Sequence, residues 1–139
     1  MGTIQFEGEY KHLKAMAEFV KAEARNLPFT NKELYAIELA MDEAASNIID
    51  HAYHGEGIGH LHLTVESQPE FLKIVLEDHG LPFDPSMIAK PDLTSPLELR
   101  SERGLGVYTM YKLMDSVKFD FTEPGTNRLT MIKKVKPAQ

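Results

Sequence analysis

Two neighbouring segments of the sequence alternate apolar and polar residues with the period of a β-strand. They read "IGHLHLTVES" (58–67) and "FLKIVLEDH" (71–79), and only "QPE" separates them. Such a short connection predicts an antiparallel hairpin. A second alternating pair, "SVKFDFTE" (116–123) and "NRLTMIKKV" (127–135), is joined by "PGT" and predicts another hairpin. The fold must therefore contain a sheet built mostly from antiparallel neighbours.

Further strand and helix patterns flank the two hairpins. Residues 3–10, "TIQFEGEY", alternate as a strand does, and residues 11–25 repeat apolar residues at helical spacing. The apolar face of this first helix holds Leu13, Met16, Phe19 and Val20. Residues 104–116, "GLGVYTMYKLMDS", predict a short amphipathic helix, in which Met110, Tyr111 and Met114 suit the core better than a partner surface. This order predicts an α+β fold, a two-layer sandwich in which helices cover one face of a mostly antiparallel mixed sheet.

A longer helix precedes the first hairpin and carries most of the polar groups of interest. Thr30 and Glu33 form a capping-box pattern that opens this helix, which should run to about His54 and stop at Gly55. One side, at 100° per residue, holds Ile37, Met41, Ala44, Ala45, Ile48 and Ala52. The other side holds Glu43, Asn47, Asp50, His51 and His54, beside Ala36 and Ala40. A solvated face would explain this polar row.

The pair Glu43 and Asn47 argues for a second interpretation of the polar row. Solvated faces usually carry Lys and Glu at four-residue spacing, whereas here an acid and an amide lie one turn apart. An amide oxygen is a suitable ligand for Mg²⁺, which also binds waters and substrate phosphates. A carboxylate in the same place can accept a proton from a hydroxyl or a water.

Composition limits the classes of function that fit the chain. Its 139 residues, 42% hydrophobic, predict one domain spanning residues 1–139, and without cysteine neither disulfides nor thiolate metal sites can form. No signal pattern and no apolar stretch of roughly 20 residues occurs, so we expect a cytoplasmic protein without a membrane span. A net charge of −6 with scattered Lys and Arg disfavours nucleic-acid binding.

Two glycine-containing motifs border a long segment of low periodicity. Asp78 and Gly80 end the strand "FLKIVLEDHG", where a carboxylate can accept a hydrogen bond from an exocyclic amine, although an ordinary turn has the same pattern. Gly104 and Gly106 open a predicted helix, whose backbone N–H groups favour phosphate, although glycines there also serve plain turns. The intervening segment, about twenty residues long with four of the eight prolines, has the length of a functional lid.

These motifs occur together in an order that resembles a known family. E-x-x-x-N on a helix, D-x-G after a strand, a long loop, G-x-G opening a helix and a Thr on a late strand look like the Bergerat ATP-binding fold of the GHKL superfamily. Within it, "MDEAASNIIDHAY", "EDHGLPFDP" and "ERGLGVYTMYKLMD" most resemble the serine/threonine kinase anti-sigma factors. The resemblance covers roughly residues 5 to 135.

The resemblance implies a role for each matching residue. Glu43 would be the general base, Asn47 would hold Mg²⁺ against the triphosphate, and Asp78 would bind the adenine amine. Thr130 would share a water with Asp78, and Gly80 would give the ring room. Phosphates would be lined by Gly104 and Gly106, with residues 81–103 as the ATP lid. From proximity alone, Arg100 or Arg103 would add positive charge, although Arg103 stands where some relatives have a small residue.

The family pattern also implies partners. It predicts a kinase that phosphorylates a STAS-domain anti-sigma-factor antagonist, sequesters a sigma factor and forms a homodimer. A non-catalytic, ATP-dependent binding module would use the same nucleotide groups and stays open as an alternative. The catalytic domain of a sensor histidine kinase is disfavoured, because His12 on a single short helix is a poor phosphoacceptor. A zinc site formed by His51, His54, His60 and His62 is also disfavoured, because no further ligand converges on them.

Overall fold

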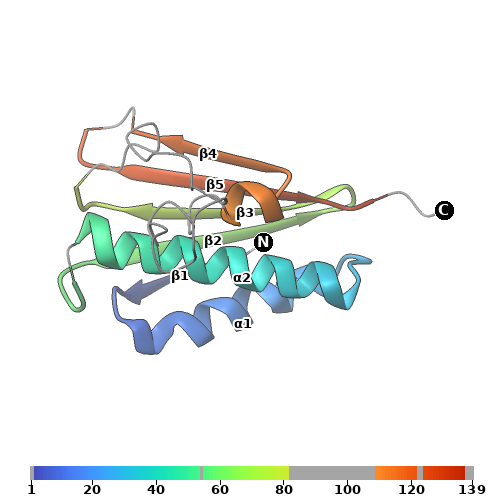
Figure 1. Cartoon of the computed structure of the whole chain (residues 1–139), viewed down its shortest axis with the longest axis horizontal. Coiled ribbons are helices and arrows are strands. Elements are labelled where there is room, and N and C mark those ends of the chain that lie inside the picture. Colours follow the sequence, from blue (N-terminus) through green and yellow to red (C-terminus); the bar gives the residue numbers. More distant parts are fainter. Residues whose placement is uncertain (1, 54, 82–108, 122–123, 137–139) are drawn as a thin grey trace, which may run out of the picture.

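The structure is a computed structural model and describes residues 2–53, 55–81, 109–121 and 124–136. Five strands form one sheet in the order β1-β2-β3-β5-β4 (Figure 1). They are β1 (Gly2–Glu7), β2 (His60–Gln68), β3 (Phe71–Asp78), β4 (Ser116–Asp120) and β5 (Asn127–Lys134). All four neighbouring pairs are antiparallel. Both predicted hairpins, β2–β3 and β4–β5, are therefore confirmed, and the sheet is more uniform than the mixed sheet we expected.

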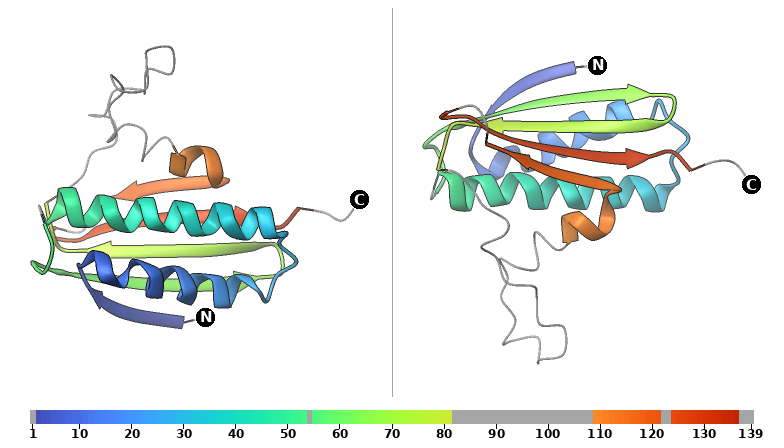
Figure 2. Two further views of the ribbon diagram at one scale, coloured as in Figure 1. Left: turned by 60° about the horizontal axis from the view of Figure 1, so that its bottom comes forward. Right: turned by 90° about the horizontal axis from the view of Figure 1, so that it is seen from above.

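The helices lie on one face of this sheet (Figure 2). A short 3₁₀ turn, η1 (Tyr10–His12), leads into α1 (Leu13–Ala24), and α2 (Asn31–Asn47) follows. Residues 109–113 are also helical. The predicted α+β sandwich, with helices covering one face, is confirmed. In the described part of the chain, no helix is both long and apolar enough to cross a membrane.

Alternation along the strands places the core between sheet and helices. The inward side chains of the three middle strands are fully or almost fully buried: Leu61, Leu63, Val65, Leu72, Ile74, Leu76, Leu129 and Met131. They pack in one cluster with Met16 and Val20 of α1 and with Ile37 and Met41 of α2. Each such side chain contributes roughly 1.5–3 kcal/mol by leaving water, so this cluster fixes α2 against the middle of the sheet.

The predicted capping box opens α2. Thr30 Oγ1 accepts a hydrogen bond from the Glu33 backbone N–H at 3.1 Å, and Glu33 Oε1 accepts one from the Thr30 N–H at 3.0 Å. Two orphan donors of the first turn are thereby satisfied. The cap fixes where α2 begins, and the packing of Ile37 and Met41 in the core cluster fixes which side of the helix its polar residues occupy.

The C-terminal end of this helix is wider than an α-helix. The α-helical part ends at Asn47, and a π-helical turn, η2 (Ile48–Ala52), continues it. Gly55 then adopts a φ of 145°, which side-chain-bearing residues rarely adopt, and its N–H bonds the Ile49 carbonyl at 2.9 Å. The helical run ends at Ala52, shortly before the predicted stop at Gly55, and the predicted α-helix is replaced by a π turn after Asn47. Such wide turns often accompany functional sites.

Two predictions about burial are wrong. Ala40, which we expected on the polar side of α2, is fully buried. Figure 2 shows α2 lying between α1 and the helical residues 109–113, so the buried arc of α2 is broader than one apolar stripe. Tyr111 is 48% exposed and does not belong to the core, whereas its neighbours Met110 and Met114 are buried as predicted.

Candidate functional site

A buried polar pair joins the ends of two adjacent strands. Asp78 is the last residue of β3, Asn127 is the first residue of β5, and the register pairs them directly. They are the buried polar or charged residues of the described chain, at 4% and 8% exposure. Asn127 Nδ2 donates to Asp78 Oδ1 at 2.8 Å, and the Gly80 N–H donates to the same oxygen at 2.9 Å. No described residue bonds Asp78 Oδ2, so this oxygen is available to a ligand.

Burial raises the pKa of the Asp78 carboxyl, because the charged form loses solvation. Hydrogen bonds from Asn127 and from the Gly80 backbone, together with the nearby His79, act in the opposite direction and lower the pKa. Buried carboxylates in proteins usually accept hydrogen bonds from nearby donors. Here two donors hold one oxygen, while the second oxygen has no such partner in the described chain.

Asn127 also fixes the chain that leaves β3. Its Nδ2 lies 3.0 Å from the Gly80 carbonyl oxygen and 3.3 Å from that of Leu81. One amide group therefore orients the carboxylate and anchors the first residues of the predicted lid. Of that lid, only Leu81 belongs to the described residues.

Asn47 and Asp78 line the same cavity from opposite layers. Asn47 reaches it from the end of α2, and Asp78 from the end of β3. The remaining wall consists of Ala44, Ile48, Leu81, Phe119, Phe121, Asn127, Arg128 and Leu129. An amide and a carboxylate set in a mostly apolar wall suit a flat heterocycle that carries an amine.

The cavity is narrow in this structure. Its volume is about 20 Å³, which is room for one water molecule. An adenine ring therefore fits only after side chains of the wall move apart. Leu81, which is 55% exposed, and the stacked rings of Phe119 and Phe121, 6.5 Å between centroids, stand at its boundary.

Asn47 and Glu43 lie one turn apart on α2, as predicted. Both are half-buried, and the Asn47 side chain makes no hydrogen bond within the described chain. An amide oxygen beside a cavity, with no partner among the described residues, fits a hard cation such as Mg²⁺. Glu43, in contrast, does not line the cavity. Its carboxylate contributes, after burial and Glu38, to a raised pKa of the neighbouring Asp42.

A tyrosine clamp holds the strand end that carries Asp78. Tyr53, which follows η2, donates its hydroxyl hydrogen to the His60 carbonyl at 2.8 Å and accepts from the His79 N–H at 3.0 Å. Its ring packs so closely on Gly59 that an added Cβ there would lie 2.2 Å from a ring carbon. Burial raises the pKa of the Tyr53 hydroxyl. The end of helix α2–η2 is therefore tied to both β2 and β3.

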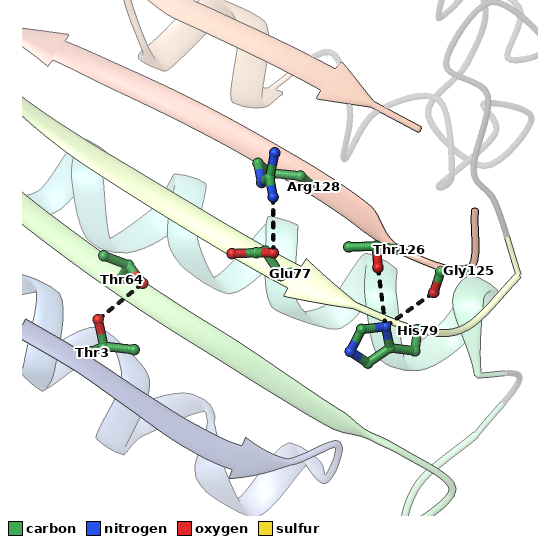
Figure 3. A network of polar contacts seen from close by, with 7 residues as sticks. All are labelled: Thr3, Thr64, Glu77, His79, Gly125, Thr126 and Arg128. Carbon is green, nitrogen blue, oxygen red and sulfur yellow. Dashed lines mark hydrogen bonds and ion pairs between the residues drawn. The ribbon is translucent and has the colours of Figure 1, made fainter. Parts of the chain in front are cut away.

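The opposite face of the sheet braces the same strand ends (Figure 3). His79 Nδ1 lies 3.0 Å from the Gly125 carbonyl oxygen in the β4–β5 turn, and Arg128 pairs with Glu77 at 3.3 Å. Because a carbonyl only accepts, His79 Nδ1 carries the proton in this contact. These contacts clamp β3 to β5 on one face, while the pair Asp78 and Asn127 does so on the other.

The structure does not place Thr130 at this site, which corrects our prediction. Thr130 pairs with Val75, three residues from the pairing of Asp78 with Asn127. Side chains of a strand alternate between faces, so Thr130 lies on the face opposite to the helices, with Arg128. Asn127 occupies the position expected of Thr130. The alternation of Asn127, Leu129 and Met131 in "NRLTMIKK" indicates that Asn127 and Thr130 point to opposite faces, although it does not give the register against Asp78.

Several predicted residues lie outside the described chain. Arg100, Arg103, Gly104 and Gly106 belong to this group, as do residues 82–103 of the predicted lid. Gly80 is described, and its N–H bonds Asp78. Asp50 of the polar row is exposed and accepts a hydrogen bond from the Tyr10 hydroxyl. The described three-ligand cluster of metal-binding type is Glu7, Glu9 and His12, and it includes neither His60 nor His62.

Comparison with known proteins decides the family. A model of the histidine kinase-like ATPase domain matches residues 6–133, nearly the whole chain. The chain belongs to the histidine kinase-like ATPase family. This confirms the predicted superfamily, and Asp78 and Asn47 thus lie in a domain of a nucleotide-using family.

Individual relatives agree with this assignment. The chain is 28% identical to serine-protein kinase RsbW of Bacillus cereus (strain Q1) over 137 residues, which cover 91% of this chain and 85% of that protein. RsbW of Bacillus anthracis matches with the same identity and coverage.

Solved structures of histidine kinases share the fold. The mycobacterial sensor histidine kinase MprB superposes with a TM-score of 0.55 at 12% identity, covering 99% of this chain and 100% of that one. The catalytic domain of histidine kinase ThkA gives 0.56 at 12% identity, with 96% of each chain covered.

Proposed function

We propose that this chain is an ATP-dependent serine/threonine protein kinase of the anti-sigma factor type. The observation that carries the proposal is the convergence of Asn47 and Asp78 on one cavity, with one oxygen of Asp78 held by donors and the other without a described partner. The similarity to serine-protein kinase RsbW, at 28% identity, supports protein phosphorylation as the activity.

In the proposed site, Asp78 accepts a hydrogen bond from the adenine amine through Oδ2. This contact selects adenine because guanine presents a carbonyl oxygen where adenine presents an amine. Gly80 stays beside the ring, and Asn127 takes the supporting role first assigned to Thr130. The side chains of Leu81, Phe119 and Phe121 move apart to admit the ring, whose burial then replaces part of their mutual contact.

The phosphates extend from the cavity past Asn47. The Asn47 amide oxygen would hold Mg²⁺, which when bound neutralises phosphate charge. We propose that the segment after Leu81 is the ATP lid and that Gly104 and Gly106 contact the phosphates, with Arg103 adding positive charge. Glu43, one turn from Asn47, accepts the proton of the attacking hydroxyl.

The partners proposed are those of the anti-sigma factor kinases. The phosphate acceptor is a STAS-domain anti-sigma-factor antagonist, the sequestered protein is a sigma factor, and the kinase works as a homodimer in the cytoplasm. Because the chain carries a net charge of −6 without a basic cluster on the described helices, nucleic acid is not a proposed partner.

One observation favours a second candidate, a non-catalytic ATP-dependent binding module. Glu43 does not line the cavity, so ATP binding and phosphoryl transfer are separable in this site. In the module, ATP would shape the partner surface without being consumed.

A transfer assay separates the two candidates. The protein is mixed with γ-labelled ATP, Mg²⁺ and each STAS-domain protein of the genome that encodes it. The kinase predicts label on a serine or threonine of one of them, and Glu43→Gln should abolish transfer while ATP affinity is retained. Stable ATP-dependent binding without transfer of label would support the module. Undiminished transfer by Glu43→Gln would contradict the role of this base.

A further inference from the structure

A single side-chain ridge on α2 leads from the protein surface to the proposed catalytic pair. Tyr35, Leu39, Glu43 and Asn47 follow one another at four-residue spacing, which is the spacing of the surface ridges that helices use in packing. The row turns gradually around the helix. It starts at Tyr35, which is 66% exposed, and ends at Asn47 in the cavity wall.

Tyr35 and Leu39, the outer residues of this ridge, do not belong to the hydrophobic core of the described chain. Neither Tyr35 nor Leu39 packs against the core cluster, although ten other partly buried apolar residues do. An aromatic ring left in water on a helix whose opposite side is fully buried contributes nothing to the core. Tyrosine is among the residues that most often dominate binding energy at protein interfaces.

The ridge belongs to an acidic part of the sequence. Residues 33–72 contain eight Asp and Glu but no Lys or Arg, whereas the whole chain has 21 acids and 15 bases. On α2 these acids are Glu33, Glu38, Asp42 and Glu43. The pKa of Asp42 is raised, by burial first and then by Glu38 and Glu43. Lys21 of α1 pairs with Glu38 at 3.1 Å. A partner that places cations beside Asp42 would reduce the remaining repulsion among the carboxylates of Glu38, Asp42 and Glu43.

Tyr35 and Leu39 lie at a short distance along α2 from Glu43, the proposed acceptor of the proton from the substrate's hydroxyl. At 1.5 Å per residue, Tyr35 lies about 12 Å and Leu39 about 6 Å along the axis from Glu43. A protein bound to Tyr35 and Leu39 can therefore place a loop at the edge of its binding surface next to Glu43. A partner that reaches Glu43 along the ridge therefore covers Leu39 and Tyr35 as well.

We infer that Tyr35 and Leu39 form the docking ridge for the protein that receives the phosphate. The surface that fits this ridge is an apolar depression rimmed by Lys or Arg, close to the acceptor serine or threonine. The ridge supplies hydrophobic contact, and Asp42 supplies attraction to the cationic rim. This inference rests on the proposed kinase function and names the surface by which the same site recognises its protein substrate.

Substitutions on the ridge test the inference. In Tyr35→Ala and Leu39→Ala, the KM for the STAS-domain substrate should rise roughly tenfold or more, while the KM for ATP stays unchanged. Tyr35→Phe keeps the ring and should retain most of the affinity. Asp42→Asn should raise the same KM by a smaller factor and weaken its dependence on salt. Ile58→Ala is the matched control, because Ile58 is an equally exposed apolar residue, at 65%, outside the ridge.

Direct binding of the same substrate makes the result decisive. An unchanged KM and Kd for the protein substrate in both alanine variants, with unaltered melting temperature, would overturn the docking ridge while leaving the kinase function intact. If the unaltered protein binds the substrate but transfers no phosphate, the kinase function fails and the binding constants alone decide the ridge. If it neither binds nor phosphorylates any STAS-domain protein, both are overturned.

Discussion

Asn127 Nδ2 lies 2.8 Å from Asp78 Oδ1 across the β3–β5 pair, and both side chains are buried. The bond joins the last residue of one strand to the first residue of its neighbour. It leaves the second carboxylate oxygen of Asp78 for a ligand, and it fixes where that oxygen points. The proposed adenine contact therefore depends on Asn127 as much as on Asp78.

Loss of the Asn127 amide should affect both stability and nucleotide binding. Asn127→Ala removes a donor from a buried carboxylate and two contacts to the carbonyls of Gly80 and Leu81, so we expect the free energy of unfolding to fall by roughly 1–3 kcal/mol. Affinity for ATP should fall as well. Thr130→Ala is the control, since Thr130 lies on the opposite face and should change neither quantity appreciably. Urea denaturation and ATP titration measure the two effects.

The raised pKa of Asp78 predicts a pH-dependent effect of Asp78→Asn on stability. In the unfolded chain this carboxyl titrates near its ordinary pKa of 3.8, and in the folded protein it titrates higher because it is buried. The folded state therefore binds more protons in that window, and the contribution of Asp78 to stability falls as pH rises through it. The side-chain amide in Asp78→Asn does not titrate, so this variant does not lose stability at position 78 as pH rises.

Denaturation of both proteins at several pH values measures this contribution. The stability of Asp78→Asn relative to the unaltered protein should increase from below pH 3.8 to neutral pH. Taking the difference between the two proteins cancels the titration of all other groups that both share. A difference that stays constant with pH would refute the assigned effect of burial.

The Tyr53 clamp should be sensitive to one added methyl group. In Gly59→Ala the new Cβ would lie 2.2 Å from the Tyr53 ring, so the ring must move and its bonds to His60 and His79 must weaken. We expect a loss of about 1–3 kcal/mol of unfolding free energy. Tyr53→Phe, which removes only the hydroxyl, should cost about 1–2 kcal/mol. Tyr35→Phe, on an exposed residue, is the control for losing a hydroxyl.

Much of the framework around the site could be predicted from local patterns. Alternation identified both hairpins, and the capping box at Thr30 and the stop at Gly55 bracketed the helix that carries Asn47. These features depend on residues close in sequence, or on the period of one element. Asn47 and Asp78 line one cavity, a convergence that only the resemblance to the Bergerat fold implied, because no local pattern brings the two elements together.

What could not be predicted depends on neighbours in space. The register of β3 against β5 decides that Asn127 and not Thr130 faces Asp78, and periodicity alone does not give that register. In the same way, Ala40 is buried because two helical segments flank α2, a fact that no residue of α2 encodes. The narrowness of the cavity depends on Leu81, which follows β3, and on the stacked rings of Phe119 and Phe121 at the end of β4, so two segments far apart in the sequence decide it.

The claim that Asn47 and Asp78 share one nucleotide site is tested most directly by calorimetric titration with ATP, with and without Mg²⁺. We expect the unaltered protein to bind ATP, Asp78→Asn to lose affinity at least tenfold in both conditions, and Asn47→Ala to lose chiefly the part that Mg²⁺ adds. No heat of binding in either condition, or full affinity in Asp78→Asn, would contradict the account.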